Sequence, residues 1–120
     1  MEKYKNITAT MNNSIINIKE VNLNQMNRQV FSNINLKIEK GEFLYLIGDT
    51  GSGKSSLLKA LYAEIKVTSG DISVANIDLT KIKHKEIPSL RRQLGIVFQD
   101  LQLLTDRTIS DNLEFVLKAT

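Results

Sequence analysis

The stretch that decides the fold is LYLIGDTGSGKSSLLKALY, residues Leu44–Tyr62, in which three glycines fall within six residues and a lysine and two serines follow at once. Glycine inside a helix or strand costs stability, so a cluster of glycines indicates a backbone conformation that other residues cannot adopt. The residues before the cluster are apolar and strand-like, and the leucines after it recur at helical spacing. The stretch therefore predicts a strand, a tight loop and a helix, in that order.

The pattern of Gly48, four residues, and then Gly53-Lys54-Ser55 is typical of a phosphate-binding P-loop. In such a loop, successive backbone N–H groups point at one anion beside a helix N-terminus. Lys54 would add positive charge at the β- and γ-phosphates of a nucleotide, and Ser55 would supply a hydroxyl ligand for Mg²⁺. The alternative is a glycine-rich turn without a ligand, which the flanking strand and helix disfavour. The residues predicted to bind the nucleotide are Gly48, Asp49, Thr50, Gly51, Ser52, Gly53, Lys54, Ser55 and Ser56.

Composition limits the class of protein. The 120 residues carry a net charge of +3 that is spread along the chain, which is not the pattern of a nucleic-acid-binding protein. The absence of cysteine excludes disulfides and thiolate metal sites. The longest apolar run, Phe43–Ile47, is far shorter than the roughly 20 residues of a membrane-spanning helix. We therefore expect a cytosolic protein, or one that reaches a membrane only through a partner.

Residues 1–14 are polar and without periodicity, and we expect a disordered leader there.

Two kinds of strand are predicted after the leader. Apolar residues alternate in Ile15–Leu23 and in Val30–Glu39, on either side of a polar turn, which indicates an antiparallel layer. Phe43–Ile47 and Leu94–Phe98 are apolar on both faces, as strands buried in a parallel sheet are. The fold class is therefore α/β.

Shorter signals complete the chain. A strand is predicted at Ile72–Val74, and a basic helix over residues 81–93, with Pro88 near its start. His84 lies in this basic run, where a solvated position is a better expectation than a metal ligand. Thr108 would cap a last helix that is still running at the end of the sequence.

Gln99 stands where the second buried strand ends, in GIVFQD. Open α/β sheets place ligand contacts at the ends of their strands, and an amide can ligate Mg²⁺ through its carbonyl oxygen and orient a water molecule. We therefore predict Lys54 and Gln99 as catalytic residues, and Ser55 and Gln99 as metal ligands. Arg91 and Arg92 are either phosphate- or partner-binding residues or ordinary surface charges.

The P-loop and the FQD of Phe98–Asp100 resemble those of the ATP-binding subunits of ABC transporters. Residues 85–120, with LRRQLGIVFQD and LLTDRTISDN, most resemble the branch that acts in bacterial cell division with the membrane protein FtsX. The resemblance implies a P-loop NTPase fold of the ABC type, in which an antiparallel layer joins a parallel core. Residues 15–120 would form the N-terminal part of such a domain, truncated after the helix that follows Gln99.

The same resemblance implies ATP and Mg²⁺ as cofactors, and a homodimer of the full-length protein that hydrolyses ATP to ADP and phosphate. The subunit would lie peripherally on the cytoplasmic face of the inner membrane, bound to an FtsX-type partner. The partner would dock on Asp100–Asn112, where Leu101, Leu103 and Leu104 are either exposed anchors or core residues. No aromatic residue stands near Gln25 to stack on adenine, which leaves Met26 or Phe31 for that contact.

Two alternatives remain open. A subunit of a lipoprotein-release or macrolide-export transporter would carry the same P-loop, and only the residues around Leu90–Asn112 favour cell division. A non-catalytic nucleotide-binding module is the alternative from another class. The signature motif, catalytic glutamate and switch histidine of the family do not occur in the 120 residues, so whether these residues alone are an ATPase is left open.

Overall fold

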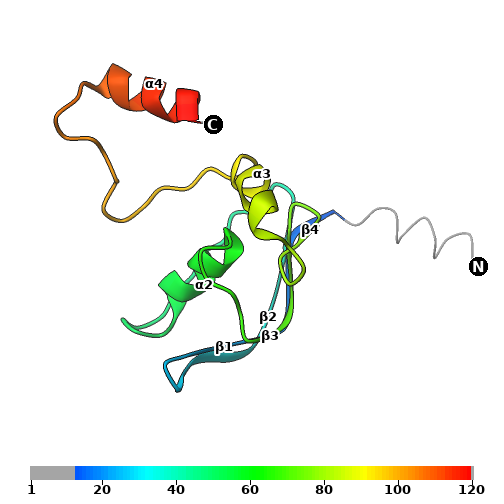
Figure 1. Cartoon of the computed structure of the whole chain (residues 1–120). Coiled ribbons are helices and arrows are strands. Elements are labelled where there is room, and N and C mark those ends of the chain that lie inside the picture. The colour runs from blue at the N-terminus through cyan, green and yellow to red at the C-terminus, as the bar shows by residue number, and fades with distance from the viewer. Residues whose placement is uncertain (1–12, 120) are drawn as a thin grey trace, which may run out of the picture.

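The structure is a computed structural model that describes residues 13–119. Two long strands form the frame of the fold. Strands β1 (Ser14–Gln25) and β2 (Arg28–Glu39) pair as an antiparallel hairpin through a turn at Met26 and Asn27. Strand β3 (Ser69–Val74) pairs with the other edge of β1, and β4 (Ile77–Asp78) follows it, which gives the order β2-β1-β3-β4. Figure 1 shows this sheet with the helices on one side of it. The predicted antiparallel layer is therefore confirmed.

A bulge in β1 changes which of its residues are buried. Simple alternation placed Ile18 and Val21 on opposite faces, but both are buried, together with Leu23. The pairing with β2 shifts register between Ile18 and Val21, and Glu20 between them has a left-handed φ of 51°. The extra residue reverses the face of the sheet on which the following side chains lie. The predicted alternation of buried and exposed residues is therefore wrong beyond Glu20. Gly70 of β3 lies against this bulge.

Asparagine amides accept backbone hydrogen bonds at two of the irregular points of the hairpin. Glu20 donates its backbone N–H to Oδ1 of Asn35 at 3.0 Å, and Asn33, whose φ is 49°, donates its N–H to Oδ1 of Asn22 at 2.8 Å. The Nδ2 of Asn22 also donates to Oγ of Ser69 on β3 at 2.9 Å. Backbone donors that leave the ladder at a bulge thus find neutral side-chain acceptors.

Helix α2 (Lys54–Leu61) covers the sheet with Leu57 and Ala60, which join Ile72 and Val74 of β3 in the buried core. This confirms the helix predicted after the glycines. Because Leu57 and Ala60 lie one turn apart, the same face of the helix meets the sheet while Lys54 at its start stays at the surface.

The two strands predicted to be buried do not form. Neither Phe43–Ile47 nor Leu94–Phe98 takes part in any sheet of the described residues. The side chains of Phe43, Ile47 and Val97 are 81%, 89% and 90% exposed. A parallel strand needs hydrogen-bonded neighbours and helices on both faces, and residues 13–119 bring none to these two segments. The local patterns identify extended chain, but the pairing depends on partners elsewhere.

The remaining elements follow β4 in the chain. A 3₁₀ turn η1 (His84–Glu86) leads into α3 (Ile87–Arg91), which Pro88 opens and which the buried Leu90 anchors, so the predicted basic helix is shorter than expected. His84 is exposed, as expected. Helix α4 (Ile109–Ala119) follows Thr108, whose Oγ1 accepts the N–H of Asp111 at 3.1 Å, which confirms the predicted cap. In the part of the chain that the structure describes, no helix has the length and apolar character to cross a bilayer. The predicted leader lies almost wholly in residues 1–12, outside the described residues.

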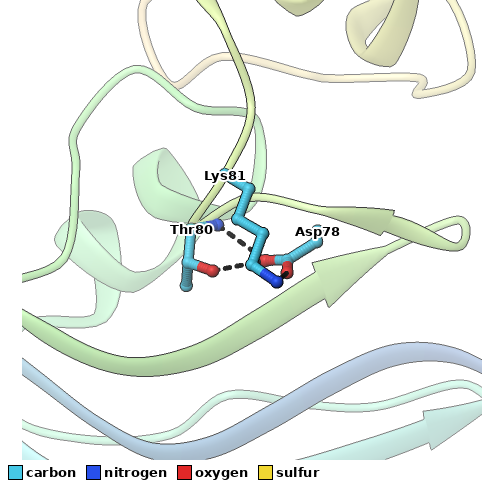
Figure 2. Close-up of polar contacts among 3 residues, drawn as sticks. All are labelled: Asp78, Thr80 and Lys81. Atoms are coloured by element: carbon cyan, nitrogen blue, oxygen red, sulfur yellow. Dashed lines mark hydrogen bonds and ion pairs between the residues drawn. The ribbon is translucent and has the colours of Figure 1, made fainter.

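Asp78 closes the turn that leaves β4. Its Oδ1 accepts the backbone N–H of Thr80 at 2.9 Å and the hydroxyl of Thr80 at 2.5 Å, and its Oδ2 lies 3.9 Å from the ammonium of Lys81 (Figure 2). The hydrogen bonds from Thr80, with a smaller contribution from Lys81, hold the pKa of Asp78 below its usual value. The ionised carboxylate is thus the form that the fold favours.

Replacing Asp78 by asparagine is expected to lower the thermal midpoint by roughly a few degrees at pH 7, because a neutral acceptor binds the Thr80 donors less well. A carboxylate whose pKa is lowered on folding adds stability above its unfolded pKa, and loses it as the pH falls through the folded value. The difference between wild type and Asp78→Asn should therefore shrink in thermal melts as the pH is lowered through the folded pKa of this carboxyl, which lies below its usual value. Asp71→Asn, an exposed carboxylate on β3, is the control; a difference that persists in acid would contradict the assignment.

Candidate nucleotide-binding site

The glycine loop turns back on itself between the extended segment and α2. Gly51 and Gly53 have left-handed φ values of 83° and 94°, and Gly53 is the N-cap residue that precedes α2. The N–H of Ser52 donates to the carbonyl oxygen of Asp49 at 3.1 Å, and the N–H of Leu57 donates to that of Gly53 at 2.9 Å. The positive φ values explain why glycine is needed at Gly51 and Gly53, since other residues adopt them only with strain.

Gly53 also fixes the loop against the sheet. A Cβ atom at this position would lie 3.2 Å from the side chains of Val30 and Phe31 and 3.3 Å from the carbonyl oxygen of Val30. The absence of a side chain therefore lets the start of α2 come close to the start of β2. The hairpin therefore contacts the N-terminal end of α2 directly.

Lys54 reaches back across the loop. Its ammonium donates to the carbonyl oxygens of Gly48 and of Asp49, the latter at 2.9 Å, and lies 3.4 Å from Oγ of Ser52. Two carbonyl groups are thus held beneath one cation, and the weak third contact is the one that an incoming anion could replace. Lys54 therefore both shapes the loop and presents positive charge at its mouth.

An open cavity of about 910 Å³ lies in front of the loop. It brings together three groups that are distant in sequence, which are the P-loop with the start of α2, the β1–β2 turn, and Gln99. The residues around it are Gln25, Met26, Arg28, Gln29, Val30, Thr50, Gly51, Gly53, Lys54, Ser55, Ser56 and Gln99. Of the predicted residues, Gly48, Asp49 and Ser52 do not line this cavity but lie behind Lys54 as its hydrogen-bonding partners.

The donor set of this cavity fits a polyphosphate. No side chain of the described residues caps the start of α2, so the N–H groups of its first turn remain available to an anion at the positive end of the helix dipole. Within residues 13–119, no group of three acidic or histidine side chains could hold a metal ion by itself. Ser55 and Gln99 suit Mg²⁺, which takes few protein ligands and completes its shell with phosphate oxygens and water.

The β1–β2 turn forms part of the wall of the cavity in front of the glycine loop. Phe31 is only 8% exposed and packs in the core, so it is excluded as the stacking residue for adenine. Met26 is fully exposed at the tip of the turn and lines the cavity. Arg28 and Gln29 line it too, and the sequence analysis missed both. Their only sequence signal is a basic and an amide residue in a hairpin turn, which does not distinguish a site from a solvated loop.

The segment after Gln99 is exposed. Leu101, Leu103 and Leu104 are all at the surface, which decides the alternative left open by the sequence in favour of exposed positions. Asn112 of α4 holds this segment, because its Oδ1 accepts the N–H of Leu104 at 2.8 Å. Its Nδ2 donates to the carbonyl oxygens of Leu104 at 3.1 Å and Thr108 at 2.8 Å. One amide thus pairs with both backbone groups of Leu104.

Replacing Asn112 by alanine is expected to raise the exchange rate of the Leu104 amide by about ten-fold, because the acceptor that protects it is gone. Hydrogen exchange followed by mass spectrometry on peptides covering residues 101–108 measures this change. Ser110→Ala, on the same helix, is the matched control and should leave the exchange unchanged. Equal protection in Asn112→Ala and wild type would show that the amide does not hold the loop.

Comparison with known proteins assigns the class. The ABC transporter family model matches residues 31–120, more than half of the chain, and the chain belongs to that family. It corresponds to the N-terminal part of an ABC ATPase.

Among individual relatives, the chain is similar to the cell division ATP-binding protein FtsE of several bacteria. It is 44% identical to that of Mycobacterium tuberculosis over 91 residues, 76% of this chain and 40% of the relative. It is 41% identical to that of Streptococcus pneumoniae over 85 residues (71% and 37%), and 40% identical to that of Escherichia coli over 90 residues (75% and 40%). The chain therefore spans about two fifths of the length of these relatives.

Solved structures confirm the fold class. The dimeric ATP-binding cassette MJ0796, in a post-hydrolysis state bound to ADP and Pi, is 31% identical with a TM-score of 0.76. The match covers 86% of this chain and 47% of that chain. The protein cbiO1 from Clostridium perfringens, part of the ABC transporter complex cbiONQ, is 30% identical with a TM-score of 0.78, over 88% of this chain and 43% of that one.

Proposed function

We propose that this chain is the nucleotide-binding part of an ATP-binding subunit of an ABC complex that acts in bacterial cell division through a membrane partner. The observation that carries the proposal is the open cavity lined by Lys54, by the uncapped start of α2 and by Gln99. The FtsE relatives are cell division ATP-binding proteins, which supports the division role, and the cassette bound to ADP and Pi supports a nucleotide as ligand.

Each group around the cavity has a distinct task. The N–H groups at the start of α2, with the Lys54 ammonium, bind the β- and γ-phosphates, and Ser56 is a second phosphate donor. Ser55 and Gln99 hold Mg²⁺, which neutralises phosphate charge when bound. Gln99 also orients water toward the γ-phosphate. Hydrolysis to ADP and phosphate belongs to the full-length homodimer, because a carboxylate that polarises water is needed in addition to these groups.

The surface after Gln99 is proposed as the docking site of the membrane partner, an FtsX-type protein. Leu101, Leu103 and Leu104 present apolar side chains there, and Asn112 fixes the backbone that carries them. A subunit held in this way would lie peripherally on the cytoplasmic face of the inner membrane. Apolar anchors on a fixed backbone are the kind of surface that receives a helix.

Binding of a fluorescent ATP analogue with Mg²⁺, followed by displacement, tests the nucleotide site. ATP should displace the analogue at least about 100-fold better than AMP, because most of the proposed contacts are to the β- and γ-phosphates. Equal displacement by AMP, or no binding at all, would refute the site.

Depletion of the protein in the producing organism tests the division role. Filamentous cells with delayed septation are expected, whereas normal division with failed lipoprotein release would favour the alternative transporter.

A further inference from the structure

The C-terminal end of α2 is held by a side chain from α3. Arg91 donates from Nε to the carbonyl oxygen of Tyr62 at 3.0 Å and from Nη2 to that of Ala63 at 3.5 Å. A helix ends with carbonyl groups that lack intrahelical partners and carry the negative end of its dipole. The guanidinium supplies both hydrogen-bond donors and positive charge at that point. It forms the C-terminal counterpart of the anion site at the other end of the same helix.

The contact continues through two aromatic rings. The Cζ atom of Arg91 lies 6.0 Å from the centre of the Tyr62 ring, within the range of a cation–π contact. The Tyr62 ring meets that of Phe98 edge to face, with centroids 6.1 Å apart and an angle of 85° between the planes. Three side chains from α3, the end of α2 and the segment before Gln99 thus form a row, called here the Arg91–Tyr62–Phe98 stack.

The stack lies next to the residue proposed to contact Mg²⁺. Phe98 immediately precedes Gln99, and Gln99 lines the cavity together with Lys54 at the opposite end of α2. Residues 94–98 make no strand pairing within the described part of the chain, and the ring contact of Phe98 with Tyr62 ties this segment to the end of α2. Helix α2 is a rigid spacer about 12 Å long between the stack and the phosphate-binding loop, at 1.5 Å per residue for its eight residues.

We infer that Arg91 is a positioning residue, which holds Gln99 at a fixed distance from the phosphate-binding end of α2 through Tyr62 and Phe98. The inference rests on the proposed nucleotide site. Its chemistry favours the planar fork of arginine, because two separate N–H groups reach the two carbonyl groups while the guanidinium carbon stays within cation–π range of the ring, whereas a lysine presents a single point charge. The neighbouring Arg92 is exposed and makes no side-chain hydrogen bond or ion pair among the described residues, which makes it a matched control.

The test compares two nucleotides on the full-length protein. Arg91→Lys and Tyr62→Leu are each expected to weaken binding of a non-hydrolysable ATP analogue with Mg²⁺ by about five- to ten-fold. They should leave binding of ADP without Mg²⁺ within about two-fold of wild type. ADP without metal reports the P-loop but not Gln99, so general damage to the fold would lower both affinities equally. Arg92→Lys should change neither, and Tyr62→Phe, which keeps the ring, should behave as wild type.

A second arm shows whether Arg91 acts through Gln99. In a Gln99→Ala background, Arg91→Lys should cause no further loss of affinity for the analogue, because the residue that it positions is gone. An additive loss in that background, or equal losses for both nucleotides, would overturn the inference while leaving the nucleotide site intact. A wild type that binds neither nucleotide would instead refute the proposed function, and the two failures are thus distinguishable.

Discussion

Replacing Lys54 by alanine is expected to weaken binding of Mg·ATP by at least about 100-fold, with little change in the thermal midpoint. Two effects add. The ammonium that would bind the β- and γ-phosphates is lost, and the carbonyl oxygens of Gly48 and Asp49, which Lys54 covers, are left facing the site. Uncovered carbonyl dipoles present their negative ends to a ligand of the same sign. Because the contacts of Lys54 lie at the surface, the fold itself should be nearly unaffected.

Calorimetric titration with a non-hydrolysable ATP analogue and Mg²⁺ measures this loss. Lys59→Ala is the matched control, because Lys59 lies in the last turn of the same helix, is exposed, and does not line the cavity. It removes one positive charge, as Lys54→Ala does, and should leave the affinity unchanged. Equal affinities of wild type and Lys54→Ala would remove the basis of the proposed function.

Replacing Gly70 by alanine is expected to destabilise the fold by roughly 4 kcal/mol, which is a large part of the stability of a small domain. A Cβ atom at Gly70 would lie 2.4 Å from the carbonyl oxygen of Glu20 and 2.6 Å from Cα of Val21. Both are backbone atoms of the β1 bulge and cannot rotate away. Moving them would displace Val21 and Leu23, which are fully buried, and the φ of +94° at Gly70 adds strain for any side chain.

Gly41→Ala separates the two causes of this destabilisation. Gly41 has a φ of +83°, close to that of Gly70, but a Cβ atom there would meet nothing within 4 Å. It should therefore show the backbone penalty alone, of about 1 to 2 kcal/mol. Denaturant unfolding of both variants measures the difference, which is the contribution of the contact with the bulge. Similar losses for Gly41→Ala and Gly70→Ala would mean that the bulge yields to the added methyl group.

The parts of the fold that could be predicted are those that local sequence determines. The glycine loop before α2, the turn between β1 and β2, and the Thr108 cap each depend on residues within a few positions of one another. Which side chains of β1 face the core could not be predicted. The bulge at Glu20 that decides this is contacted by Asn35 of β2 and Gly70 of β3, which are distant in sequence. The segments 43–47 and 94–98 have strand-like composition, but strand formation requires pairing that composition does not contain.

The candidate site divides in the same way. Lys54, Ser55 and Gln99 were named from motif and strand-end position, and the structure places all three around one cavity. Arg28 and Gln29 were missed, because their place beside the P-loop follows from the close approach of Gly53 to β2 rather than from any pattern in the turn. The row of rings through Tyr62 likewise joins residues more than thirty positions apart.

The asparagine amides that close the bulges of the hairpin carry no net charge and do not titrate near neutral pH. At 0.15 M salt the Debye length is about 8 Å, so exposed ionic contacts weaken as salt rises whereas hydrogen bonds between neutral groups do not. The platform beneath the cavity should therefore keep its shape from dilute buffer to molar salt, while attraction of a polyanion to the loop is screened. A fall in nucleotide affinity at high ionic strength would then reflect weaker electrostatic attraction between the nucleotide and the loop, and not a change in the structure of the protein.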